Sequence, residues 1–177
     1  MRAILLLSLS LFLLTNCGGS RSANPGTAAF TTVYIVRHAE KDPTPGLQDP
    51  PLTPAGEKRA VALRETLEKR NIAAIFTTNT RRTRATIAPL ATALKLPPIV
   101  YDAGKQLGIA EQIRDEYKGK TVVVVGHSNT VLPLMQELGA ALPVAQIGDN
   151  EYSYLFVVKL PLNGGTPTAT AGHYGAP

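Results

Sequence analysis

Two short runs of apolar, mostly β-branched residues constrain the fold of this chain more than any other feature. They span residues 31–36 (TTVYIV) and 121–125 (TVVVV), and neither alternates between polar and apolar residues. Alternation marks a strand with one wet face, whereas a continuous apolar run of this length is typical of a strand buried on both faces. Both runs therefore predict central strands of a sheet that helices cover on its two sides.

Helices are expected between the strands. Thr53 and Pro54 have the sequence of a helix start, because a threonine hydroxyl can cap the first turn and proline is favoured at its first position. The alternation of strands and helices predicts an α/β fold, a three-layer α/β/α sandwich with a mostly parallel central sheet. The further elements that apolar spacing predicts are helices over residues 80–94, 104–117 and 131–138 and strands over residues 73–77, 99–101 and 152–160.

The 177-residue chain is long enough for one domain, and its first part is not expected to belong to the fold. Residues 1–16 have the layout of a secretory signal, with Arg2 before an apolar run that is too short to span a bilayer. Residues 17–29 are rich in Gly, Ser and Ala and predict a flexible tether. The folded domain is expected over residues 30–160, and residues 161–177 are expected to form a loose tail or an edge strand.

Cys17, the single cysteine of the chain, directly follows the predicted signal. Its placement resembles the lipobox of bacterial lipoproteins, whose cysteine carries the lipid and becomes the first residue of the mature chain. The resemblance implies an exported protein that Cys17 anchors to a bacterial membrane, on the periplasmic or cell-surface side. Asn16 stands where a small residue is usual, so an ordinary cleaved signal is the alternative. A single thiol forms no internal disulfide, and stability must therefore come from the core.

The charge of the chain is mildly basic, with a formal net charge of +5. Such a balance suits an anionic ligand. However, no run of Lys and Arg is interleaved with aromatic residues, and the chain contains no Trp on which bases could stack. Nucleic acid is therefore not an expected partner.

Polar residues that can carry chemistry follow three of the predicted strands. Arg37 and His38 follow the first apolar run, the segment 77–84 (TTNTRRTR) follows the second strand, and His127 follows the run TVVVV after one glycine. Open parallel sheets bind ligands beyond the carboxyl ends of their strands. Two of the three histidines are therefore expected at one edge of the sheet, although they are far apart in the sequence.

Imidazole and guanidinium groups at one edge suit a phosphoryl ligand. Planar guanidinium groups match phosphate oxygens in pairs, and a neutral imidazole can attack phosphorus and carry the phosphoryl group covalently. The positive charge of Arg37 disfavours the imidazolium form of His38, so this histidine is expected to stay neutral and nucleophilic near neutral pH. His38 is therefore the candidate nucleophile.

Several segments, taken together, resemble motifs of the histidine phosphatase superfamily, the phosphoglycerate-mutase-like group. Residues 36–40 (VRHAE) are similar to the Arg-His signature that follows the family's first strand. Residues 52–56 (LTPAG) resemble the start of its next helix, and residues 78–86 resemble its Ser-Pro-Leu-x-Arg-Ala-x-x-Thr segment. Residues 125–128 (VGHS) match its second histidine. The motifs occur in the family's order over residues 31–159.

The resemblance implies a phosphoglycerate-mutase-like fold and a phosphatase that works through a phosphohistidine on His38. Arg37, Arg82 and His127 would bind the phosphoryl group and stabilise its charge. The resemblance implies no metal and no cofactor, because electrostatic positioning supplies most of what phosphoryl transfer needs. The implied substrate is a small phosphorylated molecule or an exposed phosphoryl group.

The acidic proton donor of the family has no clear counterpart in this sequence. Ser128 stands where one branch of the family has aspartate, and Asp102 and Glu111 lie in the right interval without the expected surroundings. The donor is therefore left unassigned, which predicts a preference for good leaving groups. The short interval between Arg82 and His127 leaves little chain for a lid, so we expect an open pocket and hydrolysis rather than mutase chemistry.

The charged neighbours of these motifs are expected to have structural roles. Glu40 could orient a base, but an ion pair with Lys41 or Arg37 is favoured. Arg81 and Arg84 are expected on the solvated surface of a helix start.

Two other functions are open to this sequence. Residues 126–130 (GHSNT) are similar to the nucleophile elbow of serine hydrolases, with Ser128 as nucleophile and Asp149 and His173 following in the right order. This function leaves the first histidine and the arginines unexplained. Alternatively, the chain could be a lipoprotein that binds phosphorylated ligands without turning them over.

Overall fold

The computed structural model describes residues 29–176. The predicted signal, the predicted lipid-attachment residue Cys17 and most of the predicted tether lie outside the described residues. The elements follow one another as β1 (Phe30–Arg37), α1 (Pro54–Leu67), β2 (Ile72–Thr77), α2 (Arg81–Leu94), β3 (Ile99–Val100), α3 (Gln106–Glu116), β4 (Thr121–Gly126), α4 (Ser128–Glu137), β5 (Tyr154–Pro161) and β6 (Thr168–His173). Each predicted strand and helix is confirmed within a few residues, and the segment after residue 161 contains an edge strand.

The strands form one six-stranded sheet in the order β3-β2-β4-β1-β5-β6. Neighbours among the first four strands of this order run parallel, whereas β5 is antiparallel to β1 and β6 is antiparallel to β5. The predicted mostly parallel sheet is therefore confirmed. In the register of the two central strands, Arg37 of β1 lies opposite Gly126 of β4. The residue that follows each of them in the chain is a histidine.

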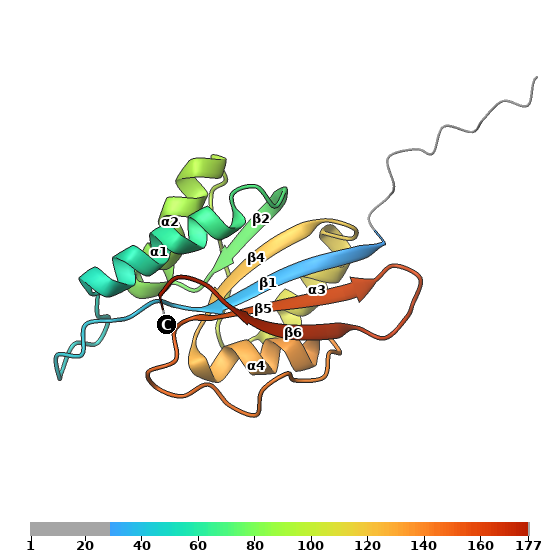
Figure 1. The fold of residues 1–177 in the computed structure, drawn as a ribbon. Coiled ribbons are helices and arrows are strands. Elements are labelled where there is room, and N and C mark those ends of the chain that lie inside the picture. The colour runs from blue at the N-terminus through green and yellow to red at the C-terminus, as the bar shows by residue number, and fades with distance from the viewer. Residues whose placement is uncertain (1–28, 177) are drawn as a thin grey trace, which may run out of the picture.

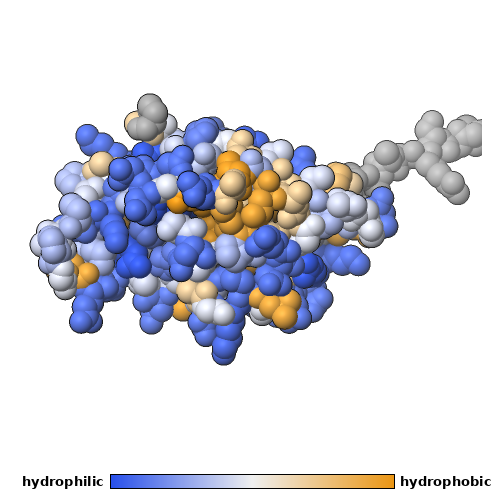
Figure 2. All heavy atoms as spheres, turned by 90° about the horizontal axis from the view of Figure 1, so that it is seen from below, coloured by the Kyte–Doolittle hydropathy of each residue, from blue (hydrophilic) through white to orange (hydrophobic). Residues whose placement is uncertain are grey.

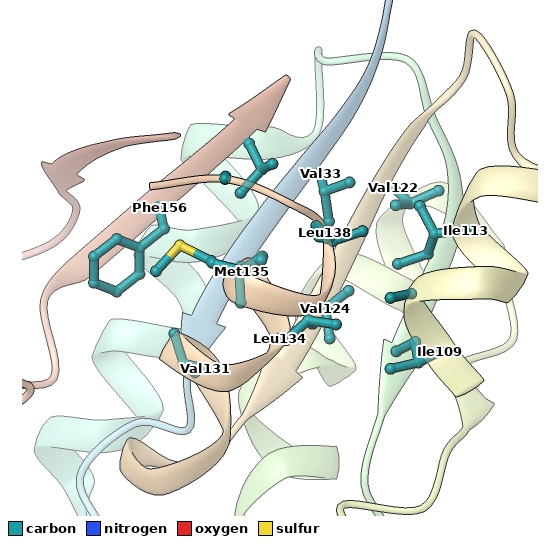
Figure 3. Close-up of a cluster of buried hydrophobic side chains, with 14 of the residues drawn as sticks. Val33, Ile109, Ile113, Val122, Val124, Val131, Leu134, Met135, Leu138 and Phe156 are labelled. Carbon is teal, nitrogen blue, oxygen red and sulfur yellow. The ribbon is translucent and has the colours of Figure 1, made fainter. Parts of the chain in front are cut away.

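Helices cover both faces of the sheet, with α1 and α2 on one side and α3 and α4 on the other (Figure 1). Strand β4 shows why its sequence is apolar throughout. Val122 and Val124 pack in the cluster that includes residues of α3 and α4, which Figure 3 shows. Val123 and Val125 point the other way and pack in the cluster that includes residues of α1 and α2. All four valines are fully buried, which confirms the prediction of a strand buried on both faces.

Helix α1 begins where the Thr53-Pro54 pair predicts. The Thr53 hydroxyl accepts a hydrogen bond from the backbone N–H of Gly56 at 3.2 Å. Gly56 packs directly on the chain that follows β1, because a Cβ atom at this position would lie 2.3 Å from the carbonyl oxygen of Glu40. The start of α1 therefore supports the segment that carries His38.

The face of the molecule that Figure 2 shows is largely hydrophilic. On the face seen from below, apolar atoms gather near the middle and polar atoms surround them (Figure 2). In residues 29–176 no helix is both long and apolar enough to cross a membrane.

Candidate active site

A cavity of about 530 Å³ lies at the carboxyl ends of β1 and β4. The four residues that the sequence predicts at the site, Arg37, His38, Arg82 and His127, all line it. The two imidazole rings lie edge to face, with their centroids 5.5 Å apart. The adjacent strand ends thus bring the two histidines together, as the sequence predicts.

His38 is held at both its backbone and its ring. Its N–H donates to the carbonyl oxygen of Gly126 at 2.9 Å, which ties the end of β1 to that of β4. Its ring Nδ1 lies 2.8 Å from the carbonyl oxygen of Ala39. A carbonyl oxygen only accepts, so Nδ1 carries the proton and Nε2 keeps a free lone pair. Burial, with smaller contributions from Arg82 and Arg37, lowers the pKa of His38 to about 3, although the hydrogen bond to Ala39 opposes the shift.

Arg37 holds the connection between α4 and β5 over the site. Its Nη1 donates to the carbonyl oxygens of Gly148, Asp149 and Glu151 at 2.8, 3.0 and 3.3 Å. Its guanidinium carbon lies 4.2 Å from the ring centroid of Tyr152. The buried Nε of Arg37 has no hydrogen-bond partner among the described residues. Arg37 therefore has a positional role at the edge of the cavity.

Arg82 reaches the cavity from the first turn of α2, whose N-cap is Thr80. Its Nη1 lies 3.6 Å from the carboxylate of Asp49, and its Nη2 lies 3.4 Å from Nδ1 of His127. Its Nε is also buried and has no partner within residues 29–176. Both arginines of the site line the cavity, and their positive charges suit an anion there.

His127 is half-buried and is held from the β2–α2 connection. Its Nε2 lies 2.9 Å from the hydroxyl oxygen of Thr78, and its backbone N–H donates to the hydroxyl of Thr130 at 2.9 Å. Burial first, and then the charges of Arg82 and Arg37, lower the pKa of His127 to about 4. Both histidines of the site are therefore neutral at neutral pH in the absence of a ligand.

Glu40 differs from its expected role. It pairs with neither Lys41 nor Arg37, but with Arg59 of α1, whose Nη2 lies 2.7 Å from its carboxylate. The same guanidinium donates to the carbonyl oxygens of Tyr174 and Ala176 at 3.0 and 2.9 Å. The sequence does contain a signal for this pair, because Arg59 shares the buried face of α1 with apolar residues at helical spacing. A buried-face arginine needs a carboxylate partner, and Glu40 supplies it.

The acidic residues that lie between Arg82 and His127 do not reach the cavity. Asp102 caps its own turn through the N–H of Gly104 at 2.9 Å, and Glu111 is exposed on α3. The carboxylate residue that lines the cavity is Asp149, from the connection that Arg37 holds. Neither carboxylate that the sequence offers as a donor is therefore brought into the site.

An open pocket was expected because the interval between Arg82 and His127 is short. Part of the walls of the site, however, comes from connections outside that interval. A second cavity of about 500 Å³ shares Arg37, Lys41 and Asp149 with the first. Its other walls are the proline-rich segment 42–50 and the segment 150–152. These flanking segments lie outside the stretch between Arg82 and His127, so they were not predicted as walls of the site.

The residues of a serine hydrolase are not assembled. Ser128 and Asp149 line the cavity, but His173 is not among its lining residues. His173 lies on β6, and its Nδ1 is 2.9 Å from the hydroxyl oxygen of Ser153. A nucleophilic serine needs an adjacent base, and His173 does not lie where it could act as the base for Ser128.

The described part of the chain contains no group of three or more His, Cys, Asp and Glu side chains placed to hold a metal ion. The chemistry open to this site is that of two neutral imidazoles and two guanidinium groups around an anion. Nucleophilic attack by the free nitrogen of His38 on a bound phosphoryl group is the reaction that these groups suit best.

One family model, described as the histidine phosphatase superfamily (branch 1), matches residues 33–106. This stretch contains Arg37, His38 and Arg82 and ends before His127. No curated protein matches the sequence.

Several solved structures share this fold. The native structure of mycobacterial glucosyl-3-phosphoglycerate phosphatase Rv2419c aligns with a TM-score of 0.65 and 16% identity, over 84% of this chain and 100% of that chain. The protein histidine phosphatase SixA, in complex with tungstate, aligns with a TM-score of 0.62 and 20% identity, over 82% of this chain and 97% of that chain. Bacillus stearothermophilus YhfR aligns with a TM-score of 0.63 and 19% identity, over 81% of this chain and 96% of that chain. The predicted phosphoglycerate-mutase-like α/β fold is therefore confirmed.

Proposed function

We propose that this chain is a phosphohydrolase of the histidine phosphatase superfamily that works through a phosphohistidine on His38. The observation that carries the proposal is the free Nε2 of His38 in a cavity lined by two guanidinium groups and a second imidazole. The match of the family model to residues 33–106 supports it independently, because that match includes three of the four residues concerned.

The reaction follows from the groups around the cavity. Arg37 and Arg82, which both line the cavity, bind the phosphoryl oxygens and stabilise their charge. Nε2 of His38 attacks phosphorus, and the bond to the leaving oxygen breaks. Water then attacks the phosphohistidine and releases phosphate. The hydrogen bond from Nδ1 to Ala39 keeps the ring oriented through both steps.

A phosphatase screen of the purified chain without residues 1–16 tests this function. The screen covers sugar phosphates, nucleotides, aryl phosphates and phosphohistidine, and vanadate, a mimic of pentacoordinate phosphorus, should compete with the substrate. Exhaustive chelation should leave turnover unchanged. Labelling of Ser128 by a fluorophosphonate would favour a serine hydrolase, and binding of phosphorylated ligands without turnover would favour a non-catalytic lipoprotein.

The substrate is proposed as a small phosphorylated molecule or an exposed phosphoryl group. Two structural neighbours are named as phosphatases, one of glucosyl-3-phosphoglycerate and one of protein histidine, which supports this breadth. We propose hydrolysis rather than mutase chemistry. The short interval between Arg82 and His127 leaves little chain for a lid, so water is expected to reach the phosphohistidine. Efficient interconversion of phosphoglycerates in the screen would contradict this proposal.

We propose further that Cys17 carries a lipid that anchors the enzyme to a bacterial membrane, on the periplasmic or cell-surface side. The apolar run before this cysteine supports the proposal. In a bacterial host, labelled palmitate should enter the wild type and not Cys17→Ser. Equal labelling of the two proteins, or a mature chain that begins elsewhere, would contradict the anchor.

A further inference from the structure

The two ring nitrogens of His127 contact groups of different hydrogen-bonding character. Nδ1 lies 3.4 Å from Nη2 of Arg82, and Nε2 lies 2.9 Å from the hydroxyl oxygen of Thr78. A guanidinium group can only donate. Nδ1 is therefore the acceptor, and Nε2 carries the proton that it donates to Thr78.

The hydrogen bonds continue from Thr78 into the protein. Its hydroxyl lies 3.0 Å from that of Thr83, and the Thr83 hydroxyl donates to the backbone carbonyl of Thr78 at 2.9 Å. With the proton of His127 on Nε2, each donor of this chain has an acceptor. Both threonines are at most 2% exposed, so water cannot replace a missing partner. The opposite tautomer would place an N–H against the donor-only guanidinium of Arg82.

We propose that His127, held in this tautomer by Thr78 and Thr83, carries a proton from the phosphoryl group of a monoanionic substrate to its leaving group. The inference rests on the proposed phosphatase function. It supplies the proton donor that the sequence leaves unassigned. His127 is then a catalytic residue, whereas Thr78 and Thr83 are positioning residues.

The first step transfers the phosphoryl group from the substrate to His38. Once the guanidinium of Arg82 donates to the phosphoryl oxygens instead of to Nδ1 of His127, the hydroxyl of the bound phosphoryl group gives its proton to Nδ1, while Nε2 keeps its own proton and its bond to Thr78. The lone pair on Nε2 of His38 forms a bond to phosphorus as the bond between phosphorus and the leaving oxygen breaks. The leaving oxygen then takes the proton from Nδ1, which restores the original tautomer.

The second step uses the same nitrogen as a base. Water attacks the phosphohistidine, and Nδ1 of His127 takes a proton from it as the new bond to phosphorus forms. The electron pair of the breaking bond between phosphorus and nitrogen returns to Nε2 of His38. The proton on Nδ1 passes to the departing phosphate. No outside acid, base or metal is consumed.

The surroundings of His127 explain why the proton must come with the substrate. The charges of Arg82, Arg37 and Lys41 all disfavour a positive charge on the ring of His127, and His38 is neutral. Two carboxylate residues lie nearby: Asp149 lines the cavity, and Asp49 lies beside Arg82. Without a ligand, the ring of His127 is therefore neutral at the pH where a phosphate monoester loses its second proton, which is about 6. The bound phosphoryl charge offsets the arginines and makes Nδ1 basic enough to accept the proton.

Nitrogen NMR of the protein labelled with ¹⁵N-histidine tests the tautomer directly. In the wild type we expect the proton of His127 on Nε2. Thr78→Val removes the acceptor at nearly constant volume and should move the proton to Nδ1, whereas Thr78→Ser should leave it on Nε2. A proton on Nδ1 in the wild type would overturn the inference.

Turnover of two substrates tests the proton route. Thr78→Val should lower kcat/KM for an alkyl phosphate by about a hundredfold, the order of a general acid's contribution, and for 4-nitrophenyl phosphate much less. The nitrophenolate leaves without a proton, so it serves as the internal reference. Thr78→Ser should restore the alkyl phosphate reaction, and Thr66→Val, which removes an α1 hydroxyl bonded to Ala62, should change neither.

Three outcomes would contradict the route. An equal loss for both substrates in Thr78→Val would show a structural defect, and a selective loss for the alkyl phosphate in Asp149→Asn would make that carboxylate the donor. A falling limb of kcat/KM that does not follow the second pKa of the substrate would exclude the monoanion as the productive form. An inactive wild type overturns the proposed function and the route together, whereas an active wild type with the proton on Nδ1 overturns the route alone.

Discussion

The ends of β1 and β4 are similar in sequence and differ in what they offer a ligand. Each is an apolar strand that runs into a histidine, and the two strands pair so that Arg37 lies opposite Gly126. At the end of β1, the carbonyl of Ala39 fixes the proton on Nδ1 and leaves Nε2 free. At the end of β4, the ring is bonded through Nε2 to the hydroxyl of Thr78, and Nδ1 faces Arg82.

The support behind the two histidines differs as well. The chain after β1 is packed between α1 and α2, because Gly56 contacts Glu40 and the N–H of Ala39 donates to the hydroxyl of Thr86 at 2.9 Å. Both histidines border the cavity, but His38 is 4% exposed, whereas His127 is half-buried. A rigid site suits a nucleophile, and a ring beside solvent suits proton exchange. The neighbours of an imidazole, more than its place at a strand end, therefore decide its role.

The largest effect should separate the two histidines by role. We expect His38→Ala to reduce turnover to background and to prevent incorporation of phosphate into the protein, because no other group can take its place. His127→Gln should lower turnover by about a hundredfold but still form the phosphoprotein, since it removes only proton transfer and one phosphate contact. Labelling with radioactive substrate measures both. A labelled His38→Ala protein would contradict the distinction.

The second prediction concerns the arginine that contacts the β4 histidine. Arg82→Ala should lower kcat/KM by about a hundredfold or more, because a preorganised charge is lost from the transition state. Arg84→Ala is the matched control, since this exposed arginine of the same helix pairs with Asn79 at 2.6 Å and does not line the cavity. Equal losses in the two variants would mean that net charge, rather than the contact, is responsible.

Local sequence patterns predict the strands, the helices and the edge at which both histidines lie. TVVVV needs no partner to be recognised as a doubly buried strand, and Thr53-Pro54 is a complete helix start in itself. Arg37 ends β1, and His38 and His127 directly follow β1 and β4, so the predicted strands place all three at the same edge of the sheet. Arg82 is identified by the resemblance of its segment to a family motif.

The remainder of the site depends on contacts that no local pattern contains. Arg59 reaches Glu40 only because Gly56 lets α1 approach the chain after β1. Tyr152 and Asp149 enter the site because Arg37 binds carbonyl groups more than a hundred residues away in the sequence. Every residue has a backbone carbonyl, so the sequence does not indicate which carbonyl groups accept from Arg37. Its role in holding the connection between α4 and β5 could therefore not be predicted.

A third prediction compares the packing of a glycine at each strand end. Gly56→Ala should lower the free energy of unfolding by about 1–3 kcal/mol, because its Cβ would meet the carbonyl oxygen of Glu40 and backbone must move. Gly126→Ala should cost less, since its Cβ would meet side-chain hydroxyls, that of Thr130 at 2.8 Å and that of Tyr101 at 3.0 Å, rather than backbone. Urea unfolding measures both.

Gly108→Ala is the control for this pair. This glycine lies within α3, and a Cβ there would have nothing within 4 Å. The alanine should therefore stabilise the protein by about 0.5–1 kcal/mol, the ordinary helix preference of alanine over glycine. A cost at Gly126 as large as that at Gly56 would show that the two strand ends are equally rigid.

The smallest effect is the dependence of stability on pH, and it should again be stronger at the end of β1. Folding lowers the pKa of His38 to about 3 and that of His127 to about 4, from an ordinary value of 6.5. Between these values the unfolded chain binds protons that the native protein does not, so stability falls as the pH falls below about 6.5 and is insensitive to these groups above it. A full proton of difference is worth about 1.4 kcal/mol per pH unit, and solvent screening reduces the contribution of the half-buried His127.

His38→Asn keeps a side-chain donor for the carbonyl of Ala39 and should flatten the slope of unfolding free energy against pH between about 6.5 and 4. His127→Gln, which keeps a donor for Thr78, should flatten it less, and His173→Gln on β6 serves as the control for loss of an imidazole outside the site. Urea midpoints at several pH values measure the slopes, and a larger flattening in His127→Gln would mean that the end of β4, rather than that of β1, is where burial most strongly excludes a proton.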